Sequence, residues 1–340
     1  MVSTTINFER SVANIFNSAI AAAAVGAAWE VGLLDAVRYQ KSVNVRDFAT
    51  QNDLDSDSVQ GLVSALAVVN IIERDQDTAM AGFLLEEAYR TKSLFHWLTL
   101  GSGGLFSRMQ YALRNKNRTG AYYHRDPTAI SYACSEANRQ FFDPVFWPAI
   151  DKLKFNKVID LGSGSGSRLM DILDRYPGTS GVGVDIAGAA VEAASAEASK
   201  RGYGDRLSFI EGNVCKLEYS KEFAQVDLLT CFLMGHDFWP RENCIAILQR
   251  LRQTFPRASR FFLGDTTRIL LNTEGSKYAV TEDDVPIFTL GFEFGHALMG
   301  VYLPTMDEWE SVFKEGGWRC VKTHFIQPPS LSVIFELEHA

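Results

Sequence analysis

The chain has 340 residues, of which 46% are hydrophobic and 22% charged, and its formal net charge is −8. This composition is typical of a globular protein long enough for two domains, and the negative charge disfavours binding to nucleic acid or to an anionic membrane surface. We expect no apolar stretch as long as the roughly 20 residues that a membrane-spanning helix needs. The first residues lack a secretion-signal pattern, and five scattered cysteines without a C-x-x-C pair fit a reduced, cytoplasmic protein.

The amino-terminal part is predicted to be helical. A long helical pattern covers about residues 7–37, and its small residues 21–28 suit either a helical core or the interface of a homodimer. Residues 42–82 follow as strand, helix, helix and two strands, which is typical of a winged helix. The second of these helices, about residues 55–69, contains no Lys or Arg and begins among Asp53, Asp55 and Asp57. These acids suit a helix N-terminus but would repel the phosphates of DNA. We therefore predict that the winged helix is a dimerisation scaffold and not a DNA-binding module.

The pattern changes near residue 150. We predict a winged-helix dimerisation domain over residues 1–100, a helical connection rich in aromatic residues over 101–150 that covers a pocket, and a third region over 151–340. In the third region the apolar runs VIDLG, GVGVD, LSFIEG, VDLLTCFLM and RFFLGD alternate with helical patterns, as in a doubly wound, Rossmann-like α/β sheet. The final segment, GWRCVKTHFIQPPSLSVIFELE, predicts an antiparallel hairpin joined by a Pro-rich turn at the sheet edge.

A glycine-rich loop follows the first of these strands. It reads Asp160-Leu-Gly162-Ser-Gly164-Ser-Gly166, and its glycines allow a ligand to approach the backbone closely. The spacing differs from the G-x-G-x-x-G of dehydrogenases, and the carboxylate of Asp160 would repel a pyrophosphate but suit the cationic amino-acid end of S-adenosylmethionine.

Two more polar residues end the next strands. Asp185 is placed to accept hydrogen bonds from a ribose, and Asn213 to reach an adenine. Together with the loop and the final hairpin, this combination resembles the class I S-adenosylmethionine-dependent methyltransferases. The resemblance implies that the loop glycines line the methionine part, that Asp185 holds the ribose, that Ile186 packs on the adenine, and that Asn213 with Val214 bounds the adenine edge.

The stretch FLMGHDFWPREN follows the fourth strand, at the edge of the sheet where open α/β folds bind ligands. His236 could be the general base of an O-methyltransferase. Alternatively, His236, Asp237 and the distant His296 could hold a metal ion. In a third interpretation, Asp237 caps the next helix and His236 is a pocket residue. Joint ligation by His236 and Asp237 requires that the chain has left the strand, which Gly235 would permit.

Several segments favour the metal interpretation through a second resemblance. GSGGLF, YHRD, DLLTCFLMGHDFWPREN and PIFTLGFEFGHALMGVYLPT resemble the α-keto acid C-methyltransferases of nonribosomal-peptide biosynthesis, a family that includes phenylpyruvate C3-methyltransferases. The resemblance implies one iron or zinc ion on His236, Asp237 and His296, with Arg125 holding the substrate carboxylate and Ser102 in the pocket. It also implies methyl transfer to C3 of a 2-oxo acid, such as 4-methyl-2-oxopentanoate or phenylpyruvate, for a peptide natural product.

Overall fold

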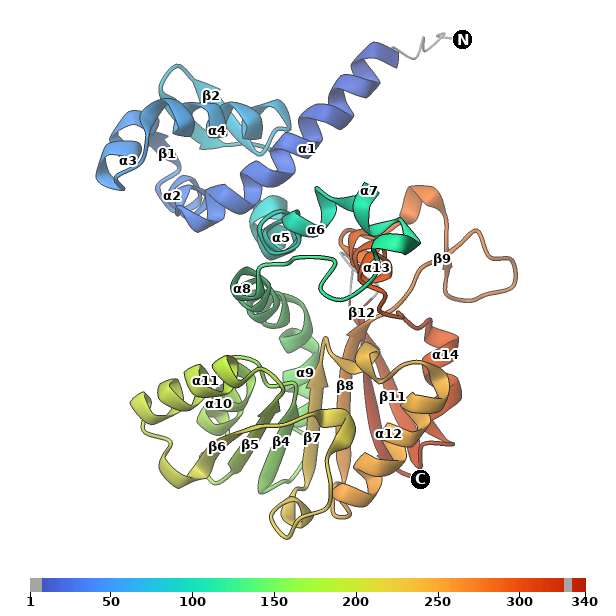
Figure 1. Ribbon diagram of the computed structural model, residues 1–340. Helices are drawn as coiled ribbons and strands as arrows, with labels where there is room; N and C mark the ends of the chain where they lie inside the picture. The colour runs from blue at the N-terminus through green and yellow to red at the C-terminus, as the bar shows by residue number, and fades with distance from the viewer. Residues whose placement is uncertain (1–7, 327–331) are drawn as a thin grey trace. The chain divides into compact units, whose positions relative to one another are not determined.

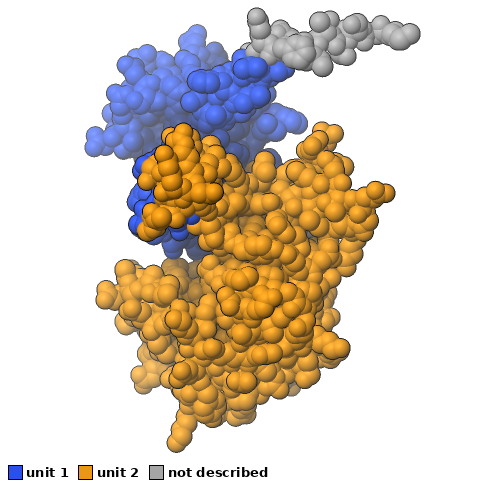
Figure 2. Space-filling view, turned by 45° about the vertical axis from the view of Figure 1, so that its right-hand side comes forward, with its two compact units in different colours: residues 1–108, 121–137 blue, residues 109–120, 138–340 orange. Residues whose placement is uncertain are grey.

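The computed structural model describes residues 8–326 and 332–340. The chain forms two compact units, coloured separately in Figure 2. Unit 1 comprises residues 1–108 and 121–137, and unit 2 comprises residues 109–120 and 138–340. The predicted helical connection over 101–150 therefore contributes to both units.

Unit 1 is mostly helical and contains the winged-helix module (Figure 1). Its three short strands form an antiparallel sheet in the order β1-β3-β2. Side-chain oxygens of Asn44 and Asp55 accept backbone N–H groups at the starts of α3 and α4, as helix N-termini require. The elements are α1 (Phe8–Glu30), α2 (Leu33–Gln40), β1 (Ser42–Asn44), α3 (Val45–Gln51), α4 (Ser56–Val68), β2 (Ile72–Asp75), β3 (Thr78–Ala81), α5 (Leu85–His96), the π-helix η1 (Trp97–Gly101), α6 (Gly103–Phe106) and α8 (Pro127–Ala137).

Helix α1 has one buried and one exposed apolar face. Val25 and Ala28 lie in the core of unit 1, where α1 packs against α4 and α5. Ile15 and Phe16 are exposed, at 72% and 69% of their full surface. By length and composition alone, the stretch Ser11–Glu30 is also long and apolar enough to cross a membrane, so the expectation that no such run exists was wrong. A core helix passes the same test, and the packing of α1 explains its buried face.

Unit 2 is built on a seven-stranded sheet in the order β11-β12-β8-β7-β4-β5-β6. The five strands from β4 to β8 are parallel to their neighbours, whereas β12 pairs antiparallel with β8 and with the edge strand β11. The predicted Rossmann-like sheet and its terminal hairpin are therefore confirmed. The predicted Pro-rich turn, residues 327–331, lies outside the described residues. The strands are β4 (Lys157–Leu161), β5 (Ser180–Asp185), β6 (Leu207–Glu211), β7 (Leu228–Phe232), β8 (Arg260–Thr266), β11 (Trp318–Phe325) and β12 (Ser332–His339), and a small parallel pair joins β9 (Leu270–Leu271) to β10 (Ala279–Val280).

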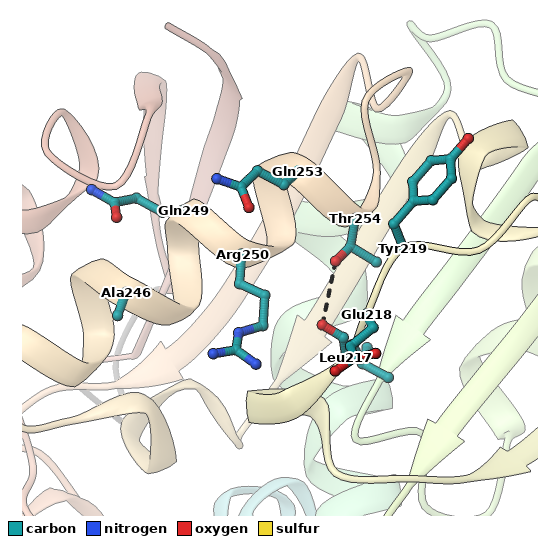
Figure 3. Close-up of a pocket in the computed structure, with 8 residues that line it drawn as sticks. All are labelled: Leu217, Glu218, Tyr219, Ala246, Gln249, Arg250, Gln253 and Thr254. Atoms are coloured by element: carbon teal, nitrogen blue, oxygen red, sulfur yellow. Dashed lines mark hydrogen bonds between the residues drawn. The ribbon is translucent and has the colours of Figure 1, made fainter.

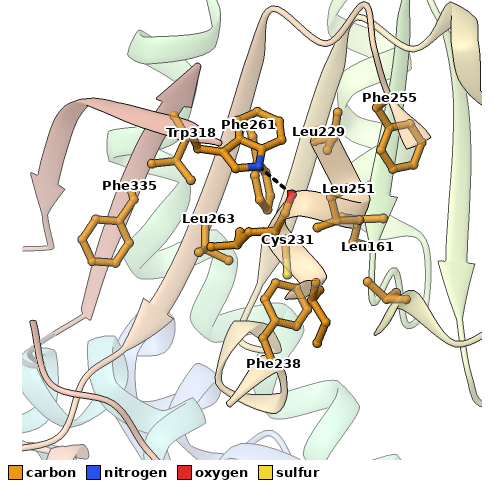
Figure 4. Close-up of a cluster of buried hydrophobic side chains, with 14 of the residues drawn as sticks. Leu161, Leu229, Cys231, Phe238, Leu251, Phe255, Phe261, Leu263, Trp318 and Phe335 are labelled. Atoms are coloured by element: carbon orange, nitrogen blue, oxygen red, sulfur yellow. Dashed lines mark hydrogen bonds between the residues drawn. The ribbon is translucent and has the colours of Figure 1, made fainter. Parts of the chain in front are cut away.

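Helices cover both faces of this sheet because its strands alternate their side chains between the faces. On one face, α12 and α14 enclose the apolar cluster of Figure 4, in which Phe261 and Trp318 lie and the Trp318 Nε1–H donates to the Leu248 carbonyl at 2.9 Å. On the other face, the ring of Phe146 in α9 packs edge-on against Phe262, the neighbour of Phe261 along β8. The remaining elements include α7 (Met109–Ala112), the π-helix η3 (Asn138–Phe142), α9 (Asp143–Ile150), α10 (Ser167–Arg175), α11 (Gly188–Lys200), η5 (Val214–Lys216), η7 (Gly235–Phe238), α12 (Arg241–Thr254), α13 (Thr289–Met299) and α14 (Met306–Phe313).

Candidate active site

The glycine-rich loop leaves β4 and opens α10 in a conformation that depends on glycine. Gly162, Gly164 and Gly166 have φ values of 76°, 49° and 73°, in the region that L side chains rarely adopt. A Cβ at Gly166 would lie 2.3 Å from the Phe209 ring, so packing also excludes a side chain there. The loop therefore exposes its backbone at the N-terminus of α10, as a close-fitting ligand site requires.

Asp160 lies just before this loop, inside the sheet. Its side chain is buried, and the Thr230 hydroxyl on the neighbouring strand β7 donates to its Oδ1 at 2.6 Å. Burial raises the pKa of Asp160 to about 6, while the positive charge of Arg168 and the Thr230 hydrogen bond oppose the rise. The carboxylate of Asp160 is thus a buried anion at the position where the sequence predicted contact with a cationic ligand.

The carboxyl ends of β5 and β6 bring the predicted nucleoside-binding residues together. The Asp185 carboxylate accepts the N–H of Gly164 at 2.8 Å, which ties the glycine loop to the end of β5. The Asn213 side chain accepts the backbone N–H of Cys215 and begins η5. Ile186 is 69% exposed, so its apolar side chain is accessible directly after β5. Val214 is buried directly after Asn213.

Strand β7 ends in a sharp turn that carries His236. Leu233 has a φ of 54° and donates its N–H to the Gly264 carbonyl at 2.8 Å, so the chain leaves the strand there. Gly235 was expected to permit this turn, but its φ is not positive and its role is packing: a Cβ would lie 2.7 Å from the Leu263 side chain. Gly235 to Phe238 form the 3-10 helix η7, which presents His236 on its buried side.

His236 is held by Asp265, a residue that the sequence analysis did not single out. The His236 Nδ1 lies 3.0 and 3.1 Å from the two carboxylate oxygens of Asp265, and the His236 backbone N–H donates to Oδ2 at 2.7 Å. The Thr266 N–H donates to Oδ1 at 2.8 Å, and Asp265 is fully buried. The sequence did contain an indication of this role. Asp265 stands at the end of the apolar run RFFLGD, as Asp160 and Asp185 stand at the ends of their predicted strands.

A second imidazole lies next to the first. The rings of His236 and His296 are 4.7 Å apart between centroids, at an interplanar angle of 78°. His296 is buried on α13, and its Nδ1 lies 2.7 Å from the Phe292 carbonyl, which can only accept. Both rings thus use Nδ1 for a protein hydrogen bond, so any ligand contact of either ring is made through Nε2. The predicted proximity of these two residues, 60 positions apart, is present in unit 2.

Asp237 follows His236 on the same 3-10 turn but is exposed. Partial burial nevertheless raises the pKa of its carboxyl, whereas the neighbouring His236 lowers it and Asp265 raises it further. Pro240 begins α12, and no side chain caps that helix, so the interpretation of Asp237 as its cap was wrong. Over residues 8–326 and 332–340, no three His, Cys, Asp or Glu side chains are assembled closely enough to hold a metal ion.

Ser102 and Arg125 belong to unit 1. The Asp126 N–H donates to the Gly101 carbonyl at 2.9 Å, which joins the backbone beside Arg125 to the backbone beside Ser102. Ser102 is fully buried, and within the described part of the chain its hydroxyl has no hydrogen-bond partner. The Arg125 guanidinium lies 5.4 Å from the Trp97 ring centre, and burial lowers its pKa, with Cys134 and Tyr123 opposing the shift. Unit 1 therefore holds a half-buried cation, Arg125, and a buried hydroxyl, Ser102, on segments joined by a backbone hydrogen bond.

Comparison with known proteins identifies the class of enzyme. The chain is 64% identical over 331 residues to the methyltransferase ungE' of Aspergillus campestris, covering 97% of each chain. The chain belongs to the methyltransferase family. The profile described as a methyltransferase domain matches residues 158–255 of this methyltransferase.

Two further similarities agree with this assignment. The methyltransferase is 26% identical over 327 residues to the indolepyruvate C-methyltransferase of Streptomyces griseus, covering 93% of this chain and 92% of that protein. Its fold matches that of human N-acetylserotonin methyltransferase in complex with S-adenosylmethionine, with a TM-score of 0.64 at 17% identity over the full length of both chains. The chain is therefore an S-adenosylmethionine-dependent methyltransferase, and the predicted class I fold is confirmed.

A separate pocket of about 350 Å³ lies on unit 2 beside α12, away from the carboxyl ends of β4 and β5 (Figure 3). The Thr254 hydroxyl donates to the Leu217 carbonyl at 3.4 Å within it. Its lining is mostly polar and exposed: Leu217, Glu218, Tyr219, Ala246, Gln249, Arg250, Gln253 and Thr254. None of the predicted site residues of the methyltransferase lies in this pocket.

Proposed function

We propose that the methyltransferase transfers the methyl group of S-adenosylmethionine to C3 of a 2-oxo acid, with the help of one iron or zinc ion. The proposal is carried by the His236–His296 pair, whose two Nδ1 atoms are both anchored on acceptors. Similarity over nearly the whole chain to an indolepyruvate C-methyltransferase supports the substrate class.

The chemistry of the donor set fits such an ion. Imidazoles that bind metals usually donate Nδ1–H to a carboxylate or a carbonyl and coordinate through Nε2, and Asp265 and the Phe292 carbonyl are acceptors of these two kinds. Asp237 would supply the third ligand after a side-chain rearrangement, since the three groups are not assembled among the described residues. A bound ion acts as a Lewis acid that stabilises negative charge on a keto oxygen.

The substrate carboxylate needs a cationic partner. We infer that Arg125, a planar and half-buried donor beside the Trp97 ring, binds the carboxylate of the 2-oxo acid, and that Ser102 contributes its buried hydroxyl. Fixing the carboxylate orients C3, and alignment of the reacting atoms supplies a large part of the rate. We propose phenylpyruvate or 4-methyl-2-oxopentanoate as the methyl acceptor. The similarity to the Streptomyces griseus enzyme makes indolepyruvate a third candidate. The methylated product would enter a peptide natural product.

The cofactor would lie across the ends of β4, β5 and β6. We infer that the Asp160 carboxylate receives the ammonium group of S-adenosylmethionine, beside Gly162, Gly164 and Gly166. The ribose hydroxyls would replace backbone N–H groups on Asp185. The adenine would lie between exposed Ile186 and the Asn213–Val214 segment.

One observation favours a second candidate function, O-methylation of a small molecule. The Asp265–His236 pair has the geometry that orients a general base, with the Nδ1 side of the ring held by a buried carboxylate. In that scheme, His236 takes the proton of a hydroxyl through Nε2 and His296 is a neighbour without a chemical task.

The variant His296→Ala separates the two functions. For the metal-dependent enzyme we expect loss of bound metal and a fall in kcat of at least about 100-fold, because one of three ligands is removed. His324→Ala is the matched control, since His324 pairs with Glu336 on the terminal hairpin. The assay combines metal analysis of the purified protein with labelled S-adenosylmethionine and a panel of 2-oxo acids and phenols.

Two results would contradict the proposal. One is full activity of His296→Ala with a methylated oxygen in the product, which supports the O-methyltransferase. The other is undiminished C3-methylation of a 2-oxo acid by metal-free protein in the presence of a chelator.

We further propose a cytoplasmic homodimer that associates through unit 1. The support is the exposed apolar face of α1, which includes Ile15 and Phe16 and is larger than isolated surface residues would explain. The acidic start of α4 remains unsuited to nucleic acid, and small-molecule substrates are the proposed partners.

A further inference from the structure

We propose that Thr230 is a positioning residue for the methyl donor: its hydroxyl holds the Asp160 carboxylate in the ionised form and orientation that receives the ammonium group of S-adenosylmethionine. This inference rests on the proposed role of Asp160 in cofactor binding.

The geometry of two neighbouring strands carries the inference. Asp160 on β4 and Thr230 on β7 are direct partners across a parallel pair, and both side chains are buried. The Thr230 Oγ1 lies 2.6 Å from Asp160 Oδ1 and 3.3 Å from the Ile159 carbonyl. A hydroxyl donates a single proton, so the shorter contact to the carboxylate takes it. Because Thr is branched at Cβ, few rotamers compete with this one.

Two groups favour the ionised form of the Asp160 carboxylate: the positive charge of Arg168 lowers its pKa most, and the Thr230 hydrogen bond comes next. Arg168 on α10 acts on it electrostatically, but the Arg168 guanidinium is paired with Asp143 at 3.0 Å and lies over an aromatic ring. Asp185 on β5 repels the ionised form, and the buried Cys231 thiol beside Thr230 interacts with it as well. The Thr230 hydroxyl is therefore the short, direct donor that favours the charged carboxylate.

The consequence is a shift in the pH dependence of donor binding. With Thr230 in place, the pKa of Asp160 is raised to about 6, so the carboxylate is mostly ionised at neutral pH. Removing a hydrogen bond to a charged group raises that pKa by about one unit. The ionised fraction then falls about fivefold at pH 6 and less than about 1.5-fold at pH 7.5. Over this range the α-amino group of the ligand stays largely protonated.

The test measures the Kd of S-adenosylmethionine for the full-length protein by calorimetry between pH 5.5 and 7.5. We expect Thr230→Val to bind about fivefold more weakly than the wild type near pH 6 and nearly equally at pH 7.5, with the midpoint of the profile displaced upward. Thr230→Ser restores the donor and should return the wild-type profile. A Thr230→Val profile that superimposes on the wild type, or that is weaker by the same factor at every pH, overturns the inference.

Asp160→Asn separates this inference from the proposed function. If that variant binds S-adenosylmethionine as the wild type does at every pH, the role of Asp160 itself is wrong. If Asp160→Asn weakens binding and abolishes its pH dependence while Thr230→Val changes neither, the role of Asp160 stands and that of Thr230 falls. Thermal unfolding of each variant shows whether the sheet is intact.

Discussion

Replacement of Asp265 by Asn probes how the site fixes His236. The Asp265 carboxylate accepts three hydrogen bonds: Oδ2 from the His236 backbone N–H, Oδ1 from the Thr266 N–H, and one or both oxygens from the His236 Nδ1. In Asp265→Asn, either orientation of the amide turns an NH₂ group toward one of the two backbone N–H groups. Two donors then face each other in a fully buried place.

This conflict has two measurable consequences. A buried donor left without an acceptor costs about 1–3 kcal/mol of the free energy of unfolding, which lowers Tm by roughly 4–8 °C at the middle of that range. An amide that presents its NH₂ to the ring also favours the tautomer with the proton on Nε2. Nε2 is then lost both as a metal ligand and as a base, and we expect kcat to fall about 10- to 100-fold, the usual effect of replacing a residue that orients a ligand.

The assay is kcat with saturating S-adenosylmethionine and 2-oxo acid, together with thermal unfolding. Asp227→Asn is the control for loss of a carboxylate charge, because Asp227 at the amino end of β7 accepts two backbone N–H groups, those of Asn156 and Lys157, on the same oxygen, Oδ2. The amide oxygen of the Asn side chain can accept both, so this variant should keep kcat and most of its stability. Wild-type kcat in a folded Asp265→Asn variant would refute the claim that Asp265 sets the protonation of His236.

Two further predictions concern the donor loop and the dimer. Gly166→Ala should weaken S-adenosylmethionine binding at least about tenfold in calorimetry, because the position needs a positive φ and an added Cβ would meet the Phe209 ring at 2.3 Å. Gly178→Ala is the control, because nothing lies within 4 Å of the added Cβ. An unchanged Kd for Gly166→Ala would contradict the reasoning. Phe16→Asp should convert a dimer into a monomer in light scattering, whereas Tyr39→Asp should not, although Tyr39 on α2 is about as exposed as Phe16. A wild-type protein that is a monomer would contradict the proposed interface.

The glycine-rich loop and the acids at the strand ends could be located from sequence because each of these features is local. The glycines of the loop are required by backbone angles at their own positions, as Gly166 shows with its φ of 73°. The acids Asp160 and Asp185 follow apolar runs that can only be buried strands, and parallel strands bring their carboxyl ends to one edge. The strands and the terminal hairpin were therefore placed correctly before any contact was known.

The orientation of His236 could not be predicted, because it depends on contacts across strands. Asp265 lies 29 residues further along the chain, and only the pairing of β7 with β8 sets it against His236. The turn that carries His236 is made by Leu233, a residue type with no preference for a positive φ, so the sequence pointed to the nearby Gly235 instead. Packing against Leu263 keeps Gly235 small, whereas the positive φ lies two residues earlier, at Leu233.

The second imidazole is what separates the two chemistries proposed for His236. A general base needs one ring whose Nδ1–H is held by an acceptor, and Asp265 supplies that alone. His296 has no role in that scheme, yet it is buried, its Nδ1 is fixed on the Phe292 carbonyl, and its ring lies 4.7 Å from that of His236. A proton taken up by one ring would be disfavoured by any charge on the other. A cation held by both rings would remove that conflict, and this is why His296→Ala is the variant that decides between proton and metal.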